Sequence, residues 1–533
     1  MPPHPRHCRV SAERVARPLL ALPGAAGRAG AGRWWVGLAV AVACFAARPA
    51  WGNAQNQIRE ILNGSSLGNT RVGVMVTDLR TGRELVEINA DTALIPASNM
   101  KLLTTAAALT RLGPDFRFTT RLLLVEPEPT PTAGETDAGG AALPSLLVRG
   151  GGDPAFGDPA LLAQAGLYLE DLVDLWVQAV VQTGQTRFQT LLLDDRIFDL
   201  EWVHPDWPVS QLHRYSYAQV AGINFYENLL AVLPVPADHD GQAPIIQTEP
   251  WFPALRTTNR ATTGRVDDFD IQRPALTNRF LFIGSVRNRR SEPYRVTVHD
   301  PPMFFAEFLR YKLKQAGISV SHLERVDPQA RVEDLPSRVL HEVNTTLAGV
   351  IDRTNRDSQN LFAEALLKRM GHELTGSPGS FANGASAVRL FLRDRLGNAV
   401  GLSAVRVADG SGLSRENRLT ARVLTTLLQT MQEQPTLGPI YAASLAHAGQ
   451  TGTLRNRLRE LTCQVYAKSG YLGASAGYAS ALSGYLVRPD GRAYAFSMIF
   501  NGFRAPVDHA RIRAVQDQIL TALDQSVNQL ADP

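Results

Sequence analysis

Apolar and polar positions first alternate along the chain and then take on a helical period. Residues 71–77 alternate as a strand does, and a turn around Gly82 leads into a second strand over 84–89, which predicts a β-hairpin. Residues 98–112 are rich in Ala and Leu and end at a Gly-Pro pair, a strong stop signal for a helix. We therefore expect a hairpin followed by a helix.

The pattern changes between residues 117 and 298. Short β-like runs, such as 145–148, 190–193 and 280–283, are separated there by loops rich in Pro and Gly. Residues 126–144 are low in complexity, and we expect a flexible loop. We interpret 117–298 as a mostly β insertion made of two subdomains.

Helical and strand patterns return after the insertion and would complete the first domain, which makes 55–116 and 299–533 one discontinuous domain. The last helix should pack on a sheet, because its apolar residues share one face. Helices are expected over 302–316, 347–356 and 361–370, strands over 478–487 and 493–501, and the apolar face of the last helix consists of Ile512, Val515, Ile519 and Leu523.

The charge of the chain is unevenly distributed. The 533 residues include 54 Lys and Arg against 50 Asp and Glu, but the first 54 residues hold seven Arg and a single acid, Glu13. The remainder has 47 basic against 49 acidic residues, which leaves no basic excess to neutralise phosphates. Nucleic acid is therefore not an expected partner.

The N-terminal region has the pattern of an export signal. An Arg-rich stretch precedes an apolar run over 34–47 that is too short to span a bilayer, and small residues at 52–54 offer a cleavage site. We expect a signal peptide over 1–54, with an uncleaved membrane anchor as the alternative. Two of the three cysteines fall within it, so that Cys463 has no partner for an internal disulfide.

A Ser-x-x-Lys sequence begins the helix expected after the hairpin. Ser98 and Lys101 are three residues apart and therefore share a helical face, where the hydroxyl and the amine can meet. A serine needs a base to become a nucleophile, and a lysine serves as that base only when burial or a nearby cation keeps it neutral. Alone, this pattern more often marks a helix-capping serine beside an exposed lysine.

Two further short motifs follow in order. A Ser-Gln-Asn sequence occupies residues 358–360 between two helices, where a hydroxyl can relay a proton and an amide can hold a substrate carbonyl. A Lys-Ser-Gly sequence occupies 468–470 at the end of a strand, where it can grip a carboxylate while the glycine admits a peptide close to the backbone. Alone, each is more often a helix cap or an edge-strand lysine.

Together the three motifs match the Ser-x-x-Lys, Ser-Asp-Asn and Lys-Thr-Gly signature of penicillin-binding proteins and class A β-lactamases, with conservative changes in the last two. The sequence resembles the D-Ala-D-Ala carboxypeptidase/endopeptidase family of class C low-molecular-mass penicillin-binding proteins. The resemblance covers roughly residues 60 to 505 and includes the long gap between Ser98 and Ser358. Further matching segments are 95–97, 113–118, 409–417 and 452–458.

The resemblance implies a fold and an activity. The fold class would be α/β (α+β), with a transpeptidase-like or β-lactamase-like domain in which helices flank an antiparallel sheet. The activity would be hydrolysis of the D-Ala-D-Ala bond, or of D-Ala-diaminopimelate crosslinks, in peptidoglycan stem peptides in the periplasm. β-Lactam antibiotics would bind as well. The expected partners are other cell-wall enzymes or a second copy of the chain, and neither a cofactor nor a metal is expected.

The resemblance also implies residue roles. Ser98 would attack the carbonyl and form an acyl-enzyme, Lys101 would take its proton, and Ser358 would pass a proton to the leaving amine. Asn360 and Lys468 would hold the substrate. Substrate binding would further involve Ser469, Gly470, Tyr471 and Arg415, with the backbone N–H groups of Ser98 and Tyr471 forming the oxyanion hole.

Two residues depart from the family pattern. Ser469 replaces the usual threonine, and Tyr471 replaces a small hydroxyl residue. The second change predicts weaker carboxypeptidase than endopeptidase action, because the phenol is poorly suited to grip the terminal carboxylate. Two alternatives stay open: a β-lactamase-like hydrolase with fast deacylation, and an inactive scaffold that binds peptidoglycan.

Overall fold

A computed structural model describes residues 50–127, 143–332, 334–397, 399–473, 477–504 and 506–529. The expected signal peptide lies outside these ranges except for its last residues, which begin helix α1 (Ala50–Gly64). The loop expected over 126–144 also lies outside them, apart from two residues at each end. Within the described ranges, no helix has both the length and the apolar character that crossing a membrane requires.

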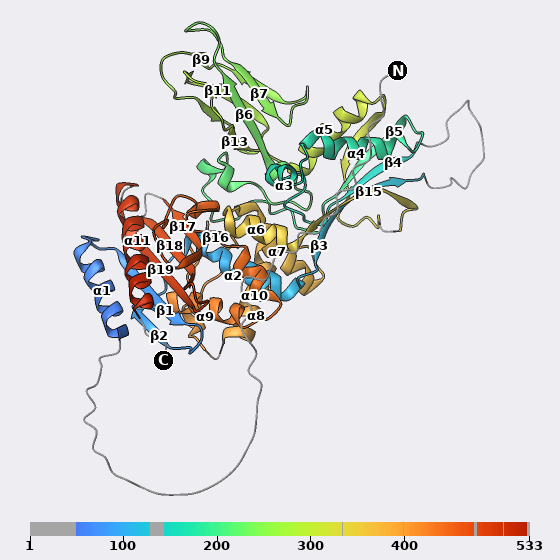
Figure 1. The fold of residues 1–533 in the computed structure, drawn as a ribbon. Helices are drawn as coiled ribbons and strands as arrows, with labels where there is room; N and C mark the ends of the chain where they lie inside the picture. Colours follow the sequence, from blue (N-terminus) through green and yellow to red (C-terminus); the bar gives the residue numbers. More distant parts are fainter. Residues whose placement is uncertain are drawn as a thin grey trace, which may run out of the picture. The chain divides into compact units, whose positions relative to one another are not determined.

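A six-stranded antiparallel sheet joins the two halves of the discontinuous domain. The strand order is β16-β17-β18-β19-β1-β2, so strands from near the end of the sequence pair with the N-terminal hairpin (Figure 1). These strands are β1 (Arg71–Asp78), β2 (Glu84–Ile88), β16 (Ala446–His447), β17 (Gln464–Leu472), β18 (Tyr478–Val487) and β19 (Ala493–Phe503). The expectation of an antiparallel sheet flanked by helices is confirmed.

Helix α11 (Pro506–Asn528) covers one face of this sheet together with α1, as Figure 1 shows. The four apolar residues expected to face the sheet, from Ile512 to Leu523, are buried in one cluster with strand residues such as Val74 and Phe496. The periodicity of the last helix therefore predicted its packing face correctly.

Helix α2 (Met100–Leu112) is the centre of the helical layer. Its ten residues from Met100 to Leu109 are all buried, because several other helices contact it. A short 3-10 turn, η1 (Ala97–Asn99), precedes it at the start of the expected helix. The surrounding helices are α6 (Leu347–Arg356), α7 (Asn360–Thr375), α8 (Phe381–Leu396), α9 (Ala421–Gln432) and α10 (Leu437–Ala443).

The inserted part is larger and more helical than expected. A five-stranded sheet with the order β14-β5-β4-β3-β15 extends to residue 346. The expected boundary at residue 298 therefore falls inside this part, because β14 pairs with β5 and β15 pairs with β3. Its elements are β3 (Arg117–Val125), β4 (Ser145–Arg149), α3 (Pro159–Gln164), α4 (Leu169–Val181), β5 (Arg187–Asp194), α5 (Pro301–Gln315), β14 (Ser319–Arg325) and β15 (Ser337–Thr346).

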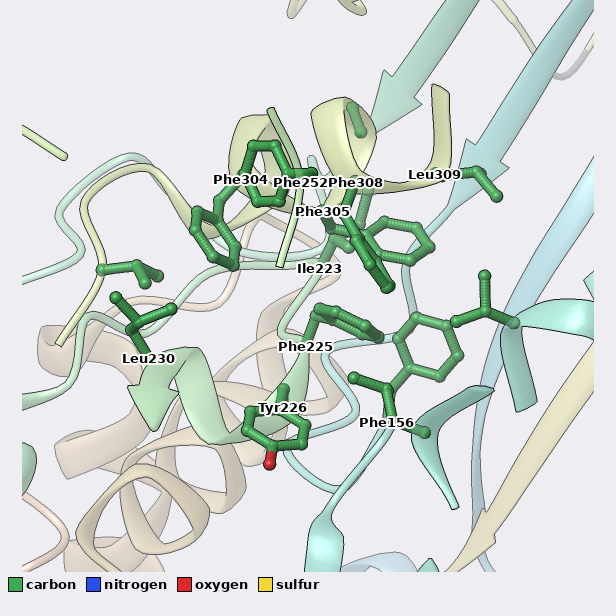
Figure 2. Close-up of a cluster of buried hydrophobic side chains, with 14 of the residues drawn as sticks. Phe156, Ile223, Phe225, Tyr226, Leu230, Phe252, Phe304, Phe305, Phe308 and Leu309 are labelled. Carbon is green, nitrogen blue, oxygen red and sulfur yellow. The ribbon is translucent and has the colours of Figure 1, made fainter. Parts of the chain in front are cut away.

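The remaining strands of the insertion form smaller sheets that share a core with the larger one. Figure 2 shows the aromatic centre of this core, where Phe156 and Phe225 lie against Phe305 of α5 at ring-centroid distances of 5.2 and 4.7 Å. The strands are β6 (Leu229–Val235), β7 (Ile245–Glu249), β8 (Arg256–Asn259), β9 (Thr262–Thr263), β10 (Asp270–Gln272), β11 (Arg279–Ile283), β12 (Ser285–Val286) and β13 (Tyr294–Thr297).

Candidate active site

Ser98 lies in a tightly packed turn at the start of α2. The preceding residue, Ala97, has a φ of 47°, a left-handed conformation that is unfavourable for alanine and is maintained by close packing. Gly412 supplies that packing: a Cβ atom there would lie 1.9 Å from the Ala97 carbonyl oxygen. On the strand side, a Cβ on Gly470 would lie 3.0 Å from the Ser98 nitrogen. The two glycines therefore allow the loop and strand to enclose the turn.

Lys101 is fully buried, and its Nζ has three oxygen neighbours. They are Oγ of Ser98 at 3.2 Å, Oδ1 of Asn360 at 2.6 Å and the carbonyl oxygen of Ser411 at 2.8 Å. A neutral amine has two hydrogens and one lone pair. The two carbonyl-type oxygens can accept the hydrogens, which leaves the lone pair directed at the Ser98 hydroxyl. This arrangement suits a general base.

The electrostatics of this environment favour the neutral amine. Burial lowers the pKa of Lys101 from 10.5 to about 7, against the opposing effect of the negative charges of Glu364 and Asp409. Glu364 is itself buried, and burial raises its pKa to about 8. Its carboxyl oxygens accept hydrogen bonds from the Gly410 and Ser411 N–H groups, both at 2.8 Å. Glu364 therefore fixes the loop whose Ser411 carbonyl holds Lys101.

A second buried lysine lies opposite the first. Nζ of Lys468, on strand β17, donates hydrogen bonds to Oγ of Ser358 and to the carbonyl oxygen of Ser469, both at 2.8 Å. Burial, and then the charge of Lys101, lower the pKa of Lys468 well below its usual range. Ser358 has a φ of 64°, a strained conformation at the junction of α6 and α7. Because its hydroxyl accepts a hydrogen bond from Nζ of Lys468, Ser358 can exchange a proton with that amine.

These groups surround a cleft of about 410 Å³. Six of the residues expected at the site line it: Ser98, Ser358, Asn360, Ser469, Gly470 and Tyr471. The two lysines lie beneath this lining and reach it through their hydrogen bonds to Ser98, Ser358 and Asn360. The structure therefore brings all three motifs together in one cleft.

The backbone of β17 offers an N–H group beside Ser98. The carbonyl oxygen of Val465 accepts a hydrogen bond from the Ala448 N–H group, so it points away from β18. Because backbone direction alternates along a strand, every second residue after Val465 also directs its N–H and C=O groups away from β18. Tyr471 lies six residues later and has the same direction. Its N–H group therefore points away from β18, and the neighbouring Gly470 has no side chain to separate the strand from the nitrogen of Ser98.

The insertion supplies cleft residues that sequence reasoning missed. Tyr215, Ser216, Leu229 and Arg295 line the cleft, and the Ser216 carbonyl oxygen accepts a 2.9 Å hydrogen bond from Nδ2 of Asn360. No short motif marks these residues, and their positions depend on how the insertion folds back. The cleft therefore includes residues from both parts of the chain.

Arg415 is the one expected substrate-binding residue that does not line the cleft. Its guanidinium is half-buried, and Nη1 has no hydrogen-bond partner among the residues that the structure describes. The surrounding loop is organised by Asp409, which accepts hydrogen bonds from the Gly412 N–H at 2.8 Å and the Asn417 amide at 2.7 Å. The clearest contribution of this loop is therefore to position the Ser411 carbonyl.

A serine hydrogen-bonded to a buried lysine, opposite a Ser-x-Asn loop and a Lys-Ser-Gly strand, is the arrangement of a serine acyl-transfer enzyme of the penicillin-binding class. The profile of the D-Ala-D-Ala carboxypeptidase 3 (S13) family matches residues 54–526, and the chain belongs to this family. The resemblance inferred from the motifs is thus confirmed. The protein is a serine-type D-Ala-D-Ala carboxypeptidase and a penicillin-binding protein.

Individual relatives agree with this assignment. The chain is 30% identical to a D-alanyl-D-alanine carboxypeptidase of Actinomadura sp. (strain R39), over 88% of this chain and 84% of the relative. It is 25% identical to the carboxypeptidase DacB of Mycolicibacterium smegmatis, with 82% and 78% covered. The crystal structure of penicillin binding protein 4 from Haemophilus influenzae shares the fold, with a TM-score of 0.70, 20% identity, and 89% and 99% of the chains covered.

Proposed function

We propose that Ser98 is the nucleophile and Lys101 the general base with which this protein hydrolyses stem peptides that end in D-Ala-D-Ala. The observation that carries the proposal is the environment of Lys101: an amine with a pKa of about 7, 3.2 Å from the Ser98 hydroxyl. An exposed lysine would be protonated at neutral pH and could not accept a proton.

The geometry supports a sequence of proton transfers. As Ser98 attacks the penultimate D-Ala carbonyl, its proton passes to Lys101, and the N–H groups of Ser98 and Tyr471 stabilise the oxyanion. The proton taken up by Lys101 is then delivered to the leaving amine of the terminal D-Ala with the Ser358 hydroxyl as the relay, and Ser358 is oriented by the hydrogen bond that it accepts from Lys468. Water releases the acyl group from Ser98 and restores the enzyme.

Penicillins should acylate the same serine and leave it slowly. Penicillin binding protein 4 of Haemophilus influenzae has been crystallised in complex with a β-lactam. Among the described residues that line the cleft here, the only carboxylate is Asp357, which accepts a hydrogen bond from the Arg353 guanidinium. A carboxylate held in this way is poorly placed to activate water, which favours a long-lived adduct over the rapid turnover of a β-lactamase.

The proposal is tested by labelling with a fluorescent penicillin. The wild type should be labelled covalently, Ser98→Ala should not be, and Ser386→Ala on helix α8, outside the cleft, should be labelled as the wild type. Each protein is also assayed for D-Ala release from a pentapeptide. Folded wild type that is neither labelled nor active would favour the scaffold alternative, and fast penicillin turnover would favour the lactamase.

Endopeptidase action on D-Ala-diaminopimelate crosslinks forms a second part of the proposal. The support is Tyr471, whose ring centroid lies 4.0 Å from that of His509 in α11, so that a phenol packed against an imidazole stands where the family usually has a small hydroxyl. The measurement compares hydrolysis of a pentapeptide and a crosslinked dimer. A strong preference for the pentapeptide would contradict this part.

We also propose that the protein works in the periplasm, on the basis of its N-terminal sequence pattern. Fractionation of cells that express the full chain, followed by mass determination of the N-terminus, tests export and cleavage near residue 54. Association with other cell-wall enzymes or with a second copy stays a prediction from the sequence, and light scattering of the purified protein tests the second of these.

A further inference from the structure

The end of the cleft beyond Ser469 is formed by a segment of helix α11 and the turn η6 (Gly452–Leu454). Thr453 from the turn and Arg513 from the helix line the cleft there, and Thr453 accepts a 2.8 Å hydrogen bond from the Ser469 hydroxyl. The insertion residue Tyr215 and the loop residue Leu413 line the same cleft from other elements. The strand end and α11 therefore define one side of the cleft.

The cleft has an excess of positive charge, most of which is already paired. Arg295 forms an ion pair with Glu227 at 3.2 Å, and Arg457 forms one with Asp517 at 2.6 Å. Across the described residues, the exposed guanidinium of Arg513 has neither an ion-pair nor a hydrogen-bond partner. Arg513 is thus the cleft-lining arginine available to a ligand.

The backbone that carries Arg513 is anchored to the strands of the cleft. The Arg457 guanidinium donates hydrogen bonds to the Arg513 carbonyl oxygen at 3.3 Å and to Oε1 of Gln516 at 3.2 Å. Nε2 of Gln516 in turn donates to Oγ of Ser480 at 3.3 Å, and Ser480 is paired with Tyr471. This chain of contacts fixes the helix beside the strand on which a substrate would lie.

The neighbouring histidine does not compete with Arg513 for an anion. Burial, and then the charges of Arg513 and Arg457, lower the pKa of His509 to about 4, so that the imidazole is neutral near pH 7. Its ring packs against that of Tyr471 at an angle of 31°. The strand end thus presents the Ser469 hydroxyl and the Tyr471 phenol, with the positive charge supplied by Arg513 of α11.

The chemistry of the substrate calls for a cation at this end. In a peptide that ends in D-Ala-D-Ala, the carbon attached to the scissile nitrogen carries a free carboxylate. In a D-Ala-diaminopimelate crosslink, the corresponding carbon also carries a carboxyl group. A guanidinium can bind either group through two parallel hydrogen bonds.

We propose that Arg513 is a specificity-determining residue that binds the carboxylate of the leaving group and so selects peptides in which this carboxylate is free. The inference rests on the proposed action of Ser98 on D-Ala-D-Ala peptides. Tyr471 on the strand is poorly suited to bind this carboxylate. Arg513 on helix α11 would bind it instead.

The test uses two peptides that differ only at the C-terminus: one ends in D-Ala-D-Ala with a free carboxylate and the other in its carboxamide. With the full-length protein, Arg513→Gln should lower kcat/KM for the acid by about 10-fold to 100-fold, mainly through KM, because a charge-assisted hydrogen bond is lost. Hydrolysis of the carboxamide should change by less than about two-fold. Arg513→Lys should restore part of the preference for the acid.

Arg511→Gln is the matched control, since Arg511 is exposed on the same helix and lines a different hollow. It should leave both peptides unaffected. An equal loss on acid and amide in Arg513→Gln, or the same loss in Arg511→Gln, would overturn the role of Arg513. A wild type that hydrolyses neither peptide would instead overturn the proposed action of Ser98, on which the inference depends.

Discussion

Nζ of Lys101 lies 2.6 Å from Oδ1 of Asn360, a residue that follows it by 259 positions and begins a different helix. An amide oxygen can accept a hydrogen from the amine without adding a negative charge. A carboxylate in the same place would favour the protonated amine and remove the base. Lys101 can therefore act as a base only with a neutral partner at this position, and the rate of Ser98 acylation should depend on pH accordingly.

The rate of Ser98 acylation should rise with pH through a value near 7. Lys101 accepts the serine proton only when neutral, and with a pKa of about 7 its neutral fraction grows from roughly a tenth at pH 6 to roughly nine tenths at pH 8. Stopped-flow measurement of penicillin acylation between pH 5.5 and 9 tests this expectation. A rate still increasing steeply above pH 9 would mean that Lys101 keeps the pKa of an exposed lysine.

Replacing the neutral partner by an acid should move that pH profile upward. Asn360→Asp places a carboxylate beside the buried Lys101 amine, which raises the pKa of Lys101 by at least about one unit. Acylation should then be slow at pH 7 and recover at higher pH. Asn360→Ala is the control: it removes the hydrogen bond without adding charge, so the midpoint of its pH profile should not rise, whatever its maximal rate. Equal profiles for the two variants would contradict the electrostatic account.

Local features of the site could be predicted from the sequence. A spacing of three residues places Ser98 and Lys101 on one helical face whatever the rest of the chain does, and the two side-chain atoms lie 3.2 Å apart. The face of the last helix followed from its period in the same way. The approach of Lys468 to Ser358 could not be predicted from local pattern, and only the combination of motifs suggested it.

Other features depend on tertiary contacts that no local pattern encodes. Strands β14 and β15 lie after the expected end of the insertion but pair with strands before it, because the choice of a strand partner is made by packing. Glu364 was missed because its role is to accept hydrogen bonds from the backbone of residues 410 and 411. The Ser216 carbonyl that binds Asn360 was missed for the same reason, since backbone groups leave no sequence signal.

The nucleophile turn should be intolerant of a methyl group at Gly412. In Gly412→Ala the new Cβ would lie 1.9 Å from the Ala97 carbonyl oxygen, at a residue whose own φ is +89°. Gly491→Ala is the control, because its φ is +88° but no atom lies within 4 Å of the added Cβ. Both variants should lose about 1 kcal/mol of stability to backbone strain. Only Gly412→Ala should also lose penicillin labelling, and equal labelling would show that the turn can move.

Glu227 should link the insertion to the catalytic loop. Its carboxylate accepts hydrogen bonds from Gln359 at 2.6 Å and from buried Arg353 at 2.8 Å, on either side of Ser358 in the sequence. Glu227→Gln should destabilise the protein by about 2 kcal/mol in urea unfolding and slow acylation several-fold, because an arginine loses a buried partner next to the loop. Glu342→Gln breaks an exposed pair with Arg121 and should change stability by less than about 1 kcal/mol, with normal acylation. If acylation in Glu227→Gln equalled that of Glu342→Gln, the insertion would not position Ser358.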